Sequence, residues 1–568
     1  MVSRINYLKK KRVLTISLVL LVWVLVIMVT LFRVQVIEYN HHFAKIKAQS
    51  QRLVDLHPKR GTIYDRLGEI LAISVKVHSA FISNRDIVSS LGVFDQVGRK
   101  IELSNRQKIS IRKRIRRGEK FVWLKRKLSD AEYLTLRSCP FSGSQKGVLN
   151  YLDEYQRVYP QGNTAAHVLG GVGIDEQALN GVELSFDSTI KGRGGKVEVF
   201  LDARRKIFHL EYLQAAQSGR DLQLTIDAVL QFMVERELAR AVRDCGAQGG
   251  AAVVMDSRDG TLLALASFPD YSPQEIWKTS PEILKNKAIS FLYDPGSTFK
   301  IILAAAALEN RICHPQQIFN CDNGIFQIRD RVIRDVHAYD RLSFTDIIVN
   351  SSNIGAAKIG LRLGAKRYFS TIRDFGFGDR TGIQLPGEEA GIMNPPARWS
   401  NVSLAYLSFG YEIAVTPIQM IRALNAIASN GVLMSPELVK NRPQSATLPQ
   451  PARFLSSATL RQLREIMTAV VDRGTGRKAG IPGVSIAGKT GTTQKLRQGE
   501  YSQVHISSFG GFLPVEKPRV SIYVMLDEPT SLYYGGDVAA PLFKAIAEKI
   551  MMYSGLFPDV NVGGETRL

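Results

Sequence analysis

The chain has 568 residues, of which 45% are hydrophobic and 22% are charged, a balance typical of a globular protein with about two or three domains. This composition excludes wholesale disorder, and ordinary contents of Gly (46) and Pro (22) exclude collagen-like and low-complexity chains. The formal net charge of +22 would suit a nucleic-acid-binding protein, so its distribution along the chain decides what it implies.

The N-terminal region predicts a membrane anchor. Residues 13–32 form a run of twenty residues without a charge, long enough to cross a bilayer as a helix, and five Lys or Arg precede it. A cleavable signal peptide would have a shorter apolar region followed by small residues, whereas Arg33, Val34 and Gln35 follow here, so an uncleaved anchor is favoured. The positive-inside rule predicts a single-pass protein of the inner (cytoplasmic) membrane, with residues 1–12 in the cytoplasm and the rest periplasmic or otherwise extracytoplasmic.

Half of the charge excess lies in one basic stretch. Between Arg99 and Lys127 there are thirteen Lys or Arg against two Glu. Ile109, Ile111 and Ile115 are interspersed with these charges as on an amphipathic element, which favours a solvated helical face over contact with anionic lipid or cell-wall polymer. Because the stretch is predicted outside the cytoplasm, we expect no nucleic-acid partner.

The four cysteines predict no metal site. Cys139, Cys245, Cys313 and Cys321 form no CxxC pair and have no His partners at zinc spacing. In an oxidising compartment Cys313 and Cys321 can form a disulfide, but spacing alone does not decide whether they do.

The remaining chain divides near residue 219. Residues 33–218 combine short apolar runs and glycine turns without a nucleophile and base, which indicates a non-catalytic domain. Residues 219–553 begin with a strand, a helix capped by Asp227 and a hairpin, continue through a helical middle, and end with three strands and a last helix. This order predicts an α+β domain, an antiparallel sheet with helices packed on it, before a tail at 554–568.

A candidate nucleophile stands in the second domain. Ser297 follows a Pro-Gly turn and precedes an apolar helical stretch, so it lies at or near a helix N-terminus, and Lys300 returns to the same face three residues later. The hydroxyl needs a base, and a lysine serves only if its pKa falls from about 10.4, which burial, a positive helix end and a second cation, Lys489, can achieve together. The same spacing at Ser188 and Lys191 precedes glycines and indicates a surface turn.

Two further motifs distinguish Ser297 from that copy. Residues 351–353 (Ser-Ser-Asn) contain the single SxN of the chain, and residues 489–492 (Lys-Thr-Gly-Thr) lie on an apparent inner strand. Taken alone, the first motif is compatible with a helix cap or turn, and the second with an edge strand whose lysine faces solvent.

Together the three motifs resemble those of the serine β-lactamases and penicillin-binding proteins. The resemblance to class B penicillin-binding proteins covers nearly the whole chain. Before the catalytic domain it rests on RGTIYDRLGEILA, FVWLKRKLSDAEY and RVYPQGNTAAHVLGGVGIDEQALNGVELSFD, and within it on SFGYEIAVTPIQMIRALNAIASNG, SSFGGFLPVEKPRV and YYGGDVAAPLFK. SFGYEIAVTP and YYGGDVAAPLF are similar to the FtsI-type division enzymes. The sequence departs from the family at Asp294, where Glu is usual, and at Glu412, where Gly is common.

The resemblance implies a β-lactamase-like transpeptidase fold after an elongated, mixed pedestal (dimerisation-like) domain, and the activity of a peptidoglycan D,D-transpeptidase that needs neither metal nor organic cofactor. It implies that Ser297 attacks the penultimate D-alanine carbonyl of a stem peptide, or is acylated by a β-lactam, with Lys300 as base. Backbone N–H groups of Ser297 and Thr492 would form the oxyanion hole. The other implied residues relay the proton and position substrate (Ser351 and Asn353), or hold the terminal carboxylate and line the sheet side (Lys489, Thr490, Gly491 and Thr492).

The implied role is septal wall synthesis during cell division. Stem peptides would be the substrates, and a polytopic glycan polymerase and other division proteins the membrane partners, although the anchor alone needs no partner. Three alternatives stay open: an elongation-type enzyme with the same catalytic set, a non-catalytic β-lactam sensor or scaffold, and a hydrolase such as a β-lactamase or carboxypeptidase. The single hydrophobic span disfavours a sensor, and the long N-terminal domain disfavours a small secreted hydrolase.

Overall fold

The computed structural model describes residues 2–40, 51–56, 58–84, 86–201, 207–440, 453–497 and 499–555. The chain forms two compact units, of which the first comprises Met1–Lys59 and Lys191–Gly219 and the second Arg60–Ile190 and Arg220–Leu568. The functional division at 218 and 219 stays a prediction, and most of the tail predicted at 554–568 lies outside the described residues.

The first unit contains a long apolar helix and a three-stranded sheet. Helix α1 (Val2–Phe32) continues as the π-helical segment η1 (Arg33–Ile37), and Arg12–Ile37 is the one described helix long and apolar enough to span a membrane. Its apolar side chains are exposed, as those of a helix in lipid would be. The sheet has the order β1-β6-β7, with antiparallel pairs. Its strands are β1 (Gln51–Leu56), β6 (Gly195–Leu201) and β7 (Ile207–Gln214).

In the second unit, residues 60–190 form a mixed region, here called the pedestal. Its sheet has the order β4-β3-β2-β8, and β5 also pairs with β3. β2 and β8 pair in parallel, so the sheet includes a strand from beyond residue 219. The strands are β2 (Ile63–Tyr64), β3 (Ile70–Ser83), β4 (Phe121–Leu128), β5 (Leu149–Val158) and β8 (Leu222–Gln223). The helices that share a core with this sheet are α3 (Ile87–Val97), α4 (Asn105–Arg116) and α5 (Asp130–Arg137).

Helix α4 corresponds to the basic stretch. It begins at a capping box formed by Ser104 and Gln107, and it buries Ile111 and Ile115 against the pedestal core. Ile109 is exposed among the cations. The amphipathic element predicted here is therefore present, with one of its three isoleucines on the solvated face.

A cluster of buried charges ties the pedestal together. Arg60 donates to Glu183 at 2.7 Å and to Asp187 at 2.6 Å, and Arg157 donates to the other oxygen of Glu183 at 2.6 Å. The side chains of Arg60, Arg157 and Glu183 are at most 1% exposed. Burial by itself would lower the pKa of Arg60, but Glu183 and Asp187 outweigh it and raise that pKa above its ordinary value. Arg60 therefore stays charged inside the fold, and Arg157 shares the Glu183 carboxylate with it.

The rest of the second unit is built on a five-stranded antiparallel sheet of order β10-β9-β17-β16-β15. This arrangement confirms the α+β fold with helices packed on an antiparallel sheet. The strands are β9 (Gly249–Asp256), β10 (Leu262–Phe268), β15 (Ala487–Arg497), β16 (Glu500–Leu513) and β17 (Val520–Asp527).

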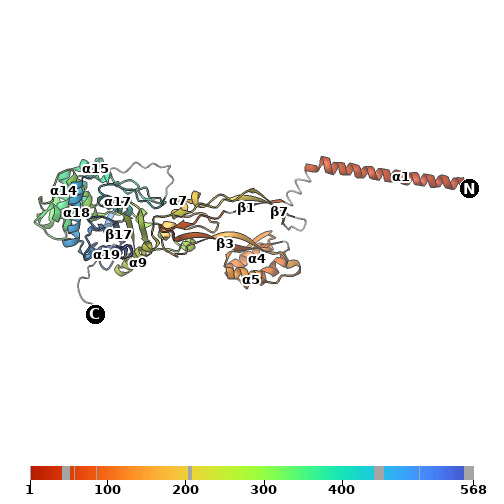
Figure 1. Ribbon diagram of the computed structural model, residues 1–568, viewed down its shortest axis with the longest axis horizontal. Helices are drawn as coiled ribbons and strands as arrows, with labels where there is room; N and C mark the ends of the chain where they lie inside the picture. The colour runs from red at the N-terminus through yellow and green to blue at the C-terminus, as the bar shows by residue number, and fades with distance from the viewer. Residues whose placement is uncertain are drawn as a thin grey trace, which may run out of the picture. The chain divides into compact units, whose positions relative to one another are not determined.

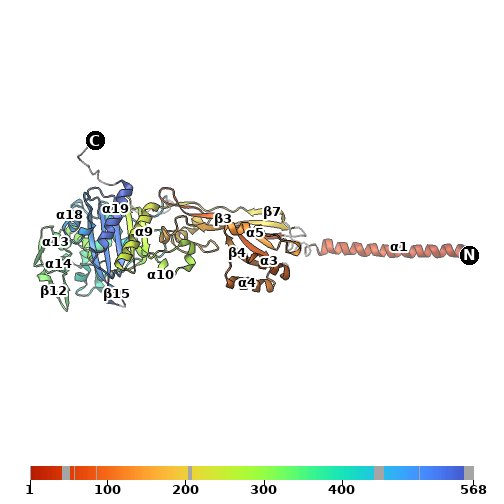
Figure 2. The same ribbon diagram turned by 90° about the horizontal axis from the view of Figure 1, so that it is seen from below.

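Alternation along β9 assigns a face of the sheet to each layer of helices. Ala252 and Val254 pack with α9 (Ala228–Cys245) and α19 (Ala539–Ser554), and Asp227 caps α9 as predicted. The opposite face packs against the helical middle of the sequence, and Figures 1 and 2 show α14 and α18 on the other side of the sheet from α9. The helices of this layer are α12 (Lys300–Glu309), α14 (Asn353–Leu363), α17 (Pro417–Ala428) and α18 (Ser457–Arg473).

One detail differs from the sequence-based expectations, and one that the sequence left open is decided. Strand β15, which carries Lys489, is an edge strand and not an inner one. Lys489 is nevertheless 0% exposed, because α18 and the turn around Ser297 cover the strand. Cys313 and Cys321 are both buried free thiols, so the bridge that spacing allowed is not formed. Among the described residues, no group of three or more His, Cys, Asp or Glu is placed to hold a metal ion.

Candidate active site

The candidate nucleophile lies where a turn meets the edge strand. Ser297 is in the 3-10 turn η4 (Gly296–Phe299), which leads directly into α12. Gly296 has a φ of +55°, and a Cβ added there would lie 3.1 Å from the carbonyl oxygen of Thr492 on β15. A side chain at this position would be both strained and crowded. The helix start and the strand therefore adjoin, as an oxyanion hole built from both would require.

Lys300, the first residue of α12, is completely buried. Its Nζ donates to Ser351 O at 2.6 Å and to Asn353 Oδ1 at 2.8 Å, with Ser351 Oγ at 3.3 Å. Burial lowers the pKa of Lys300 to about 7, although the Asp335 carboxylate acts in the opposite direction. Within the described residues, Lys300 forms no hydrogen bond with Ser297. Direct proton transfer between these two side chains therefore stays a prediction.

Lys489 approaches the same hydroxyl from the sheet. Its Nζ donates to Ser351 Oγ at 3.0 Å, and to the carbonyl oxygen and Oγ1 of Thr490, both at 3.3 Å. Burial, and then repulsion by Lys300, lowers the pKa of Lys489 well below its ordinary value. Ser351 Oγ thus lies between two buried amines whose pKa values are depressed, which is an arrangement able to accept and pass on a proton.

The SxN segment is held by an aspartate that the sequence did not single out. Ser351 has a φ of +62°, a conformation that costs a residue other than glycine about 1–3 kcal/mol. Asp335 accepts hydrogen bonds from Ser352 Oγ at 2.5 Å and from Ile354 N at 3.0 Å, and it also accepts from the backbone of Asn353. No motif places Asp335 near the site, since it stands sixteen residues before Ser351 on another segment.

The residues after Lys489 form the sheet side of the site. Thr490 Oγ1 is 2.7 Å from Thr475 Oγ1, and Thr492 Oγ1 accepts from Gly535 N at 2.8 Å. A Cβ added at Gly491 would lie 2.4 Å from Ser508 Oγ, so a side chain there would displace its neighbours. Thr490 and Thr492 keep their hydroxyls at the cleft while Gly491 lets β15 approach the nucleophile turn.

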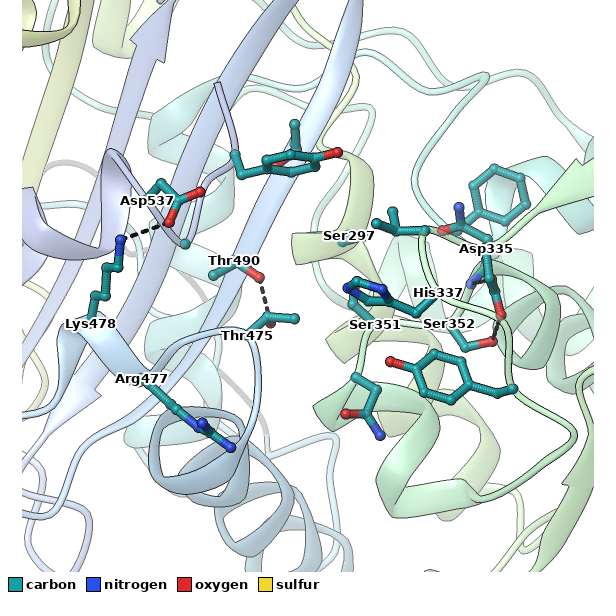
Figure 3. A pocket seen from close by; sticks show the side chains of 18 of the residues that line it. Ser297, Asp335, His337, Ser351, Ser352, Thr475, Arg477, Lys478, Thr490 and Asp537 are labelled. Atoms are coloured by element: carbon teal, nitrogen blue, oxygen red, sulfur yellow. Dashed lines mark hydrogen bonds and ion pairs between the residues drawn. The ribbon is translucent and has the colours of Figure 1, made fainter. Parts of the chain in front are cut away.

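A cavity of about 490 Å³ joins the two sides. Five of the predicted site residues line it, namely Ser297, Ser351, Asn353, Thr490 and Thr492, whereas Lys300, Lys489 and Gly491 are not part of its lining. Figure 3 shows Thr475, Thr490 and Lys478 on the sheet side, facing Ser297, Ser351 and His337 on the helical side. The remaining lining was not predicted and includes Asp335, His337, Tyr339, Tyr411, Arg477, Lys478, Tyr534 and Asp537.

The two positions that depart from the family pattern lie near each other beside the nucleophile turn. Asp294 accepts a hydrogen bond from Tyr501 Oη at 2.9 Å, and the Tyr501 ring meets that of Tyr411 edge-on with centroids 5.1 Å apart. Burial, with a contribution from Glu412, raises the pKa of Asp294 to about 6. Tyr501, from β16, thereby links the sheet to the segment just before Ser297.

Comparisons with known proteins show what the whole chain is similar to. The family model of the penicillin binding protein transpeptidase domain matches residues 250–548, and that of the penicillin-binding protein dimerisation domain matches residues 55–224. Stage V sporulation protein D of Bacillus subtilis is 31% identical, over 98% of this chain and 88% of its own. Peptidoglycan D,D-transpeptidase FtsI of Escherichia coli K12 is 31% identical, over 91% and 87%. Penicillin binding protein 3 of Mycobacterium tuberculosis, solved in complex with aztreonam, superimposes with a TM-score of 0.67 and 28% identity, over 89% of this chain and 98% of that one.

Proposed function

The chain belongs to the penicillin-binding protein transpeptidase family, and we propose from this that it is a peptidoglycan D,D-transpeptidase that cross-links stem peptides through an acyl-enzyme at Ser297. The observation that carries the residue assignment is the position of Ser351 Oγ, within 3.3 Å of Lys300 Nζ and 3.0 Å of Lys489 Nζ at the wall of a cavity that Ser297 also lines.

In the proposed reaction, Ser297 Oγ attacks the carbonyl carbon of the penultimate D-alanine and loses its proton to neutral Lys300. The peptide C–N bond breaks, and the terminal D-alanine leaves as an amine after taking a proton back through Ser351, which Asn353 helps to position. An amine from a second stem peptide then attacks the ester, forms the cross-link and restores the Ser297 hydroxyl. Backbone N–H groups of Ser297 and Thr492 stabilise the oxyanion in both halves.

Lys489 and its neighbours are assigned to the terminal carboxylate of the substrate. Thr490 and Thr492 offer hydroxyls on the same wall of the cavity, and Gly491 keeps the strand close. A carboxylate bound there would raise the depressed pKa of Lys489, because an opposite charge favours the ammonium form. Substrate binding would then supply the counter-ion that Lys489 otherwise lacks.

We assign the apolar helix to the inner membrane, with residues 1–12 in the cytoplasm and all of the chain after Arg33, the pedestal included, outside it. A reporter that is active only outside the cytoplasm, fused after residue 60, tests this orientation. The same helix is proposed to contact a polytopic glycan polymerase and other division proteins. Activity of a cytoplasmic reporter at residue 60 would reverse the orientation and remove access to peptidoglycan.

The physiological role proposed is septal cross-linking, which the similarity to a FtsI enzyme supports. The similarity to a sporulation protein of equal identity, together with the elongation-type alternative, makes a direct test necessary. Depletion in the host should block division while growth continues, giving filaments or enlarged undivided cells. Loss of width control with normal septa would instead indicate an elongation enzyme.

The chemical proposal is tested by intact-mass analysis after incubation with a β-lactam. Wild-type protein should gain one acyl adduct that persists, since a sensor or transpeptidase deacylates slowly whereas a β-lactamase releases the adduct. Ser297→Ala should gain none, and Ser188→Ala, which removes the serine of the other SxxK segment, should be labelled like the wild type. Formation of cross-linked dimers from stem-peptide substrates then separates an enzyme from a sensor. An adduct on Ser297→Ala would refute the assignment.

A further inference from the structure

A second cavity, of about 620 Å³, lies between the pedestal and the segment that follows β10. Its walls come from the ends of β4 and β5, from residues 172–179, and from the 3-10 helix η3 (Pro273–Lys278). It shares no lining residue with the catalytic cleft. All of these segments belong to the second compact unit, so the cavity is formed within one folded body.

Unpaired buried polar atoms gather around this cavity. Arg157 Nη2, Tyr159 Oη and Glu176 Oε2 are three of the seven buried side-chain atoms that lack a hydrogen-bond partner among the described residues, and all three side chains line it. Arg157 and Tyr159 are at least nine-tenths buried. A guanidinium can only donate, an ionised carboxylate can only accept, and a phenol does both. A ligand that satisfies all three must therefore carry groups that donate and accept, such as hydroxyls or amides.

The charges that line the cavity are already neutralised. Arg126 is paired with Glu154 and Asp175, and Lys127 is paired with Glu176 at 2.7 Å. Arg157 is paired with Glu183 as described above. The cavity therefore has no spare charge with which to select a strongly anionic or cationic ligand. Its remaining polar lining consists of three amide side chains, those of Gln156, Gln177 and Gln274.

Large apolar side chains with solvent exposure also line the cavity. Trp277 on η3 is 66% exposed, and Ile174 and Leu179 are 50% and 42% exposed. An exposed indole offers a flat apolar surface beside the glutamine amides. A sugar ring matches this combination. The C–H groups on one face of the ring can cover the indole while the hydroxyls at its edge bond to the polar atoms.

Backbone strain coincides with the same wall. Lys127 has a φ of 51° and Glu176 a φ of 60°, and these two left-handed residues are the ones joined by the 2.7 Å ion pair. Strained residues other than glycine persist where the surrounding structure holds a functional geometry. Glu176 Oε1 accepts from Lys127 Nζ at 2.7 Å and from Arg157 N at 3.2 Å, whereas Oε2 has no hydrogen-bond partner among the described residues.

We propose that this cavity binds an N-acetylated sugar of the peptidoglycan glycan strand, with Trp277 stacked on the ring and the glutamine amides and the unpaired polar atoms bonded to hydroxyl and acetamido groups. The identity of the polymer rests on the proposed function, since a transpeptidase works on peptides attached to such strands. The site would hold a strand on the pedestal while its peptides are processed elsewhere on the protein.

The test uses the full chain in detergent and glycan strands stripped of their stem peptides by an amidase, which cannot react at Ser297. Isothermal titration calorimetry should detect saturable binding. Trp277→Ala should weaken it by at least about tenfold, as loss of an aromatic anchor does, whereas Trp277→Phe should retain most of it. Phe232→Ala is the matched control, because Phe232 is a 52% exposed aromatic on α9 outside the cavity.

Absence of binding by the wild type, or equal binding by Trp277→Ala, would overturn the proposal. In a third outcome, neither the wild type nor Trp277→Ala binds the stripped glycan, but Trp277→Ala still impairs wall synthesis in cells. The cavity then binds a protein, and the sugar assignment is wrong. Labelling of the same samples by a β-lactam separates the two proposals. Failure of glycan binding with normal labelling contradicts this site alone, and normal glycan binding without labelling contradicts the acyl-enzyme at Ser297.

Discussion

Two regions of the protein each bury a pair of cationic side chains, but only one of the regions provides a carboxylate in contact with them. In the pedestal, Arg60 and Arg157 both contact the Glu183 carboxylate at 2.6–2.7 Å. In the catalytic cleft, Lys300 and Lys489 are 0% exposed, and within the described chain their Nζ atoms bond only to hydroxyl, carbonyl and amide oxygens. The Glu183 and Asp187 carboxylates raise the pKa of Arg60. Burial lowers the pKa of Lys300 and of Lys489, and within the described chain no carboxylate contacts either amine to offset it.

The choice of side chain follows the same logic. Arginine does not lose its proton in proteins and binds carboxylates through two parallel hydrogen bonds, so it suits a permanent link. Lysine changes its pKa readily when buried, so it suits a proton acceptor. Burial alone therefore does not identify the reactive cations, whereas the absence of a contacting carboxylate does.

The strongest test of this comparison exchanges the two side-chain types. Lys300→Arg places a permanent cation where a neutral amine is required, and the rate of acylation by a β-lactam should fall by about a thousandfold or more, since general-base catalysis is lost. The reciprocal Arg60→Lys should lower the melting temperature but leave the acylation rate of the folded protein unchanged. Stopped-flow acylation and thermal unfolding measure the two effects, and near-normal acylation by Lys300→Arg would remove Lys300 from the role of base.

Removing the shared counter-ion tests the pedestal side. Glu183→Gln leaves two buried guanidinium groups without their carboxylate and should destabilise the protein by about 3–5 kcal/mol. Glu119→Gln is the control, because its pair with Arg114 is more than one-third exposed at both ends and should contribute less than about 1 kcal/mol. Denaturant unfolding measures both values. Equal losses of unfolding free energy for the two variants would show that the buried ion pairs stabilise the protein no more than an exposed pair does.

The pH dependence of acylation tests the cleft side. Lys300 accepts a proton only when neutral, and its pKa is about 7, so the neutral fraction rises as pH rises through 7 and falls below it. Acylation should therefore slow by about tenfold between pH 8 and pH 6. Initial rates with a β-lactam that does not titrate in this range report the profile. A midpoint near the ordinary lysine value would mean that burial has not shifted the base.

The smallest expected effect concerns Asp335, a carboxylate that influences Lys300 without a hydrogen bond to it. Asp335 raises the pKa of Lys300, so Asp335→Asn should move the midpoint of the acylation profile to lower pH, by less than about one unit. Asp322→Asn, which removes the partner of Lys358 instead, should leave the midpoint in place. A shift in the opposite direction would mean that Asp335 acts only by holding the SxN segment.

The sequence was sufficient to predict the antiparallel sheet, the amphipathic α4 and the cap at Asp227, because periodicity and capping are local. The meeting of the three motifs at the cleft was predicted from the resemblance to a family and not from their spacing. The edge position of β15, the free thiols of Cys313 and Cys321, and the contact of Asp335 with the SxN segment depend on which distant segments pack together. The ion pair of Arg60 with Glu183 in the pedestal is a further case, since these residues are more than one hundred positions apart and no motif connects them.

The strand order of the first unit has a consequence for how the chain matures. Gln51 on β1 pairs with Phe200 on β6, and everything in the pedestal lies between them in the sequence. At synthesis rates of about 5–20 residues per second, β1 would leave the ribosome roughly 7–30 s before its partner exists. During that interval the backbone N–H and C=O groups of β1 form an open strand edge. Correct assembly of this sheet must therefore wait until the whole pedestal has been synthesised, and chaperones that bind extended chains can act on β1 during that delay.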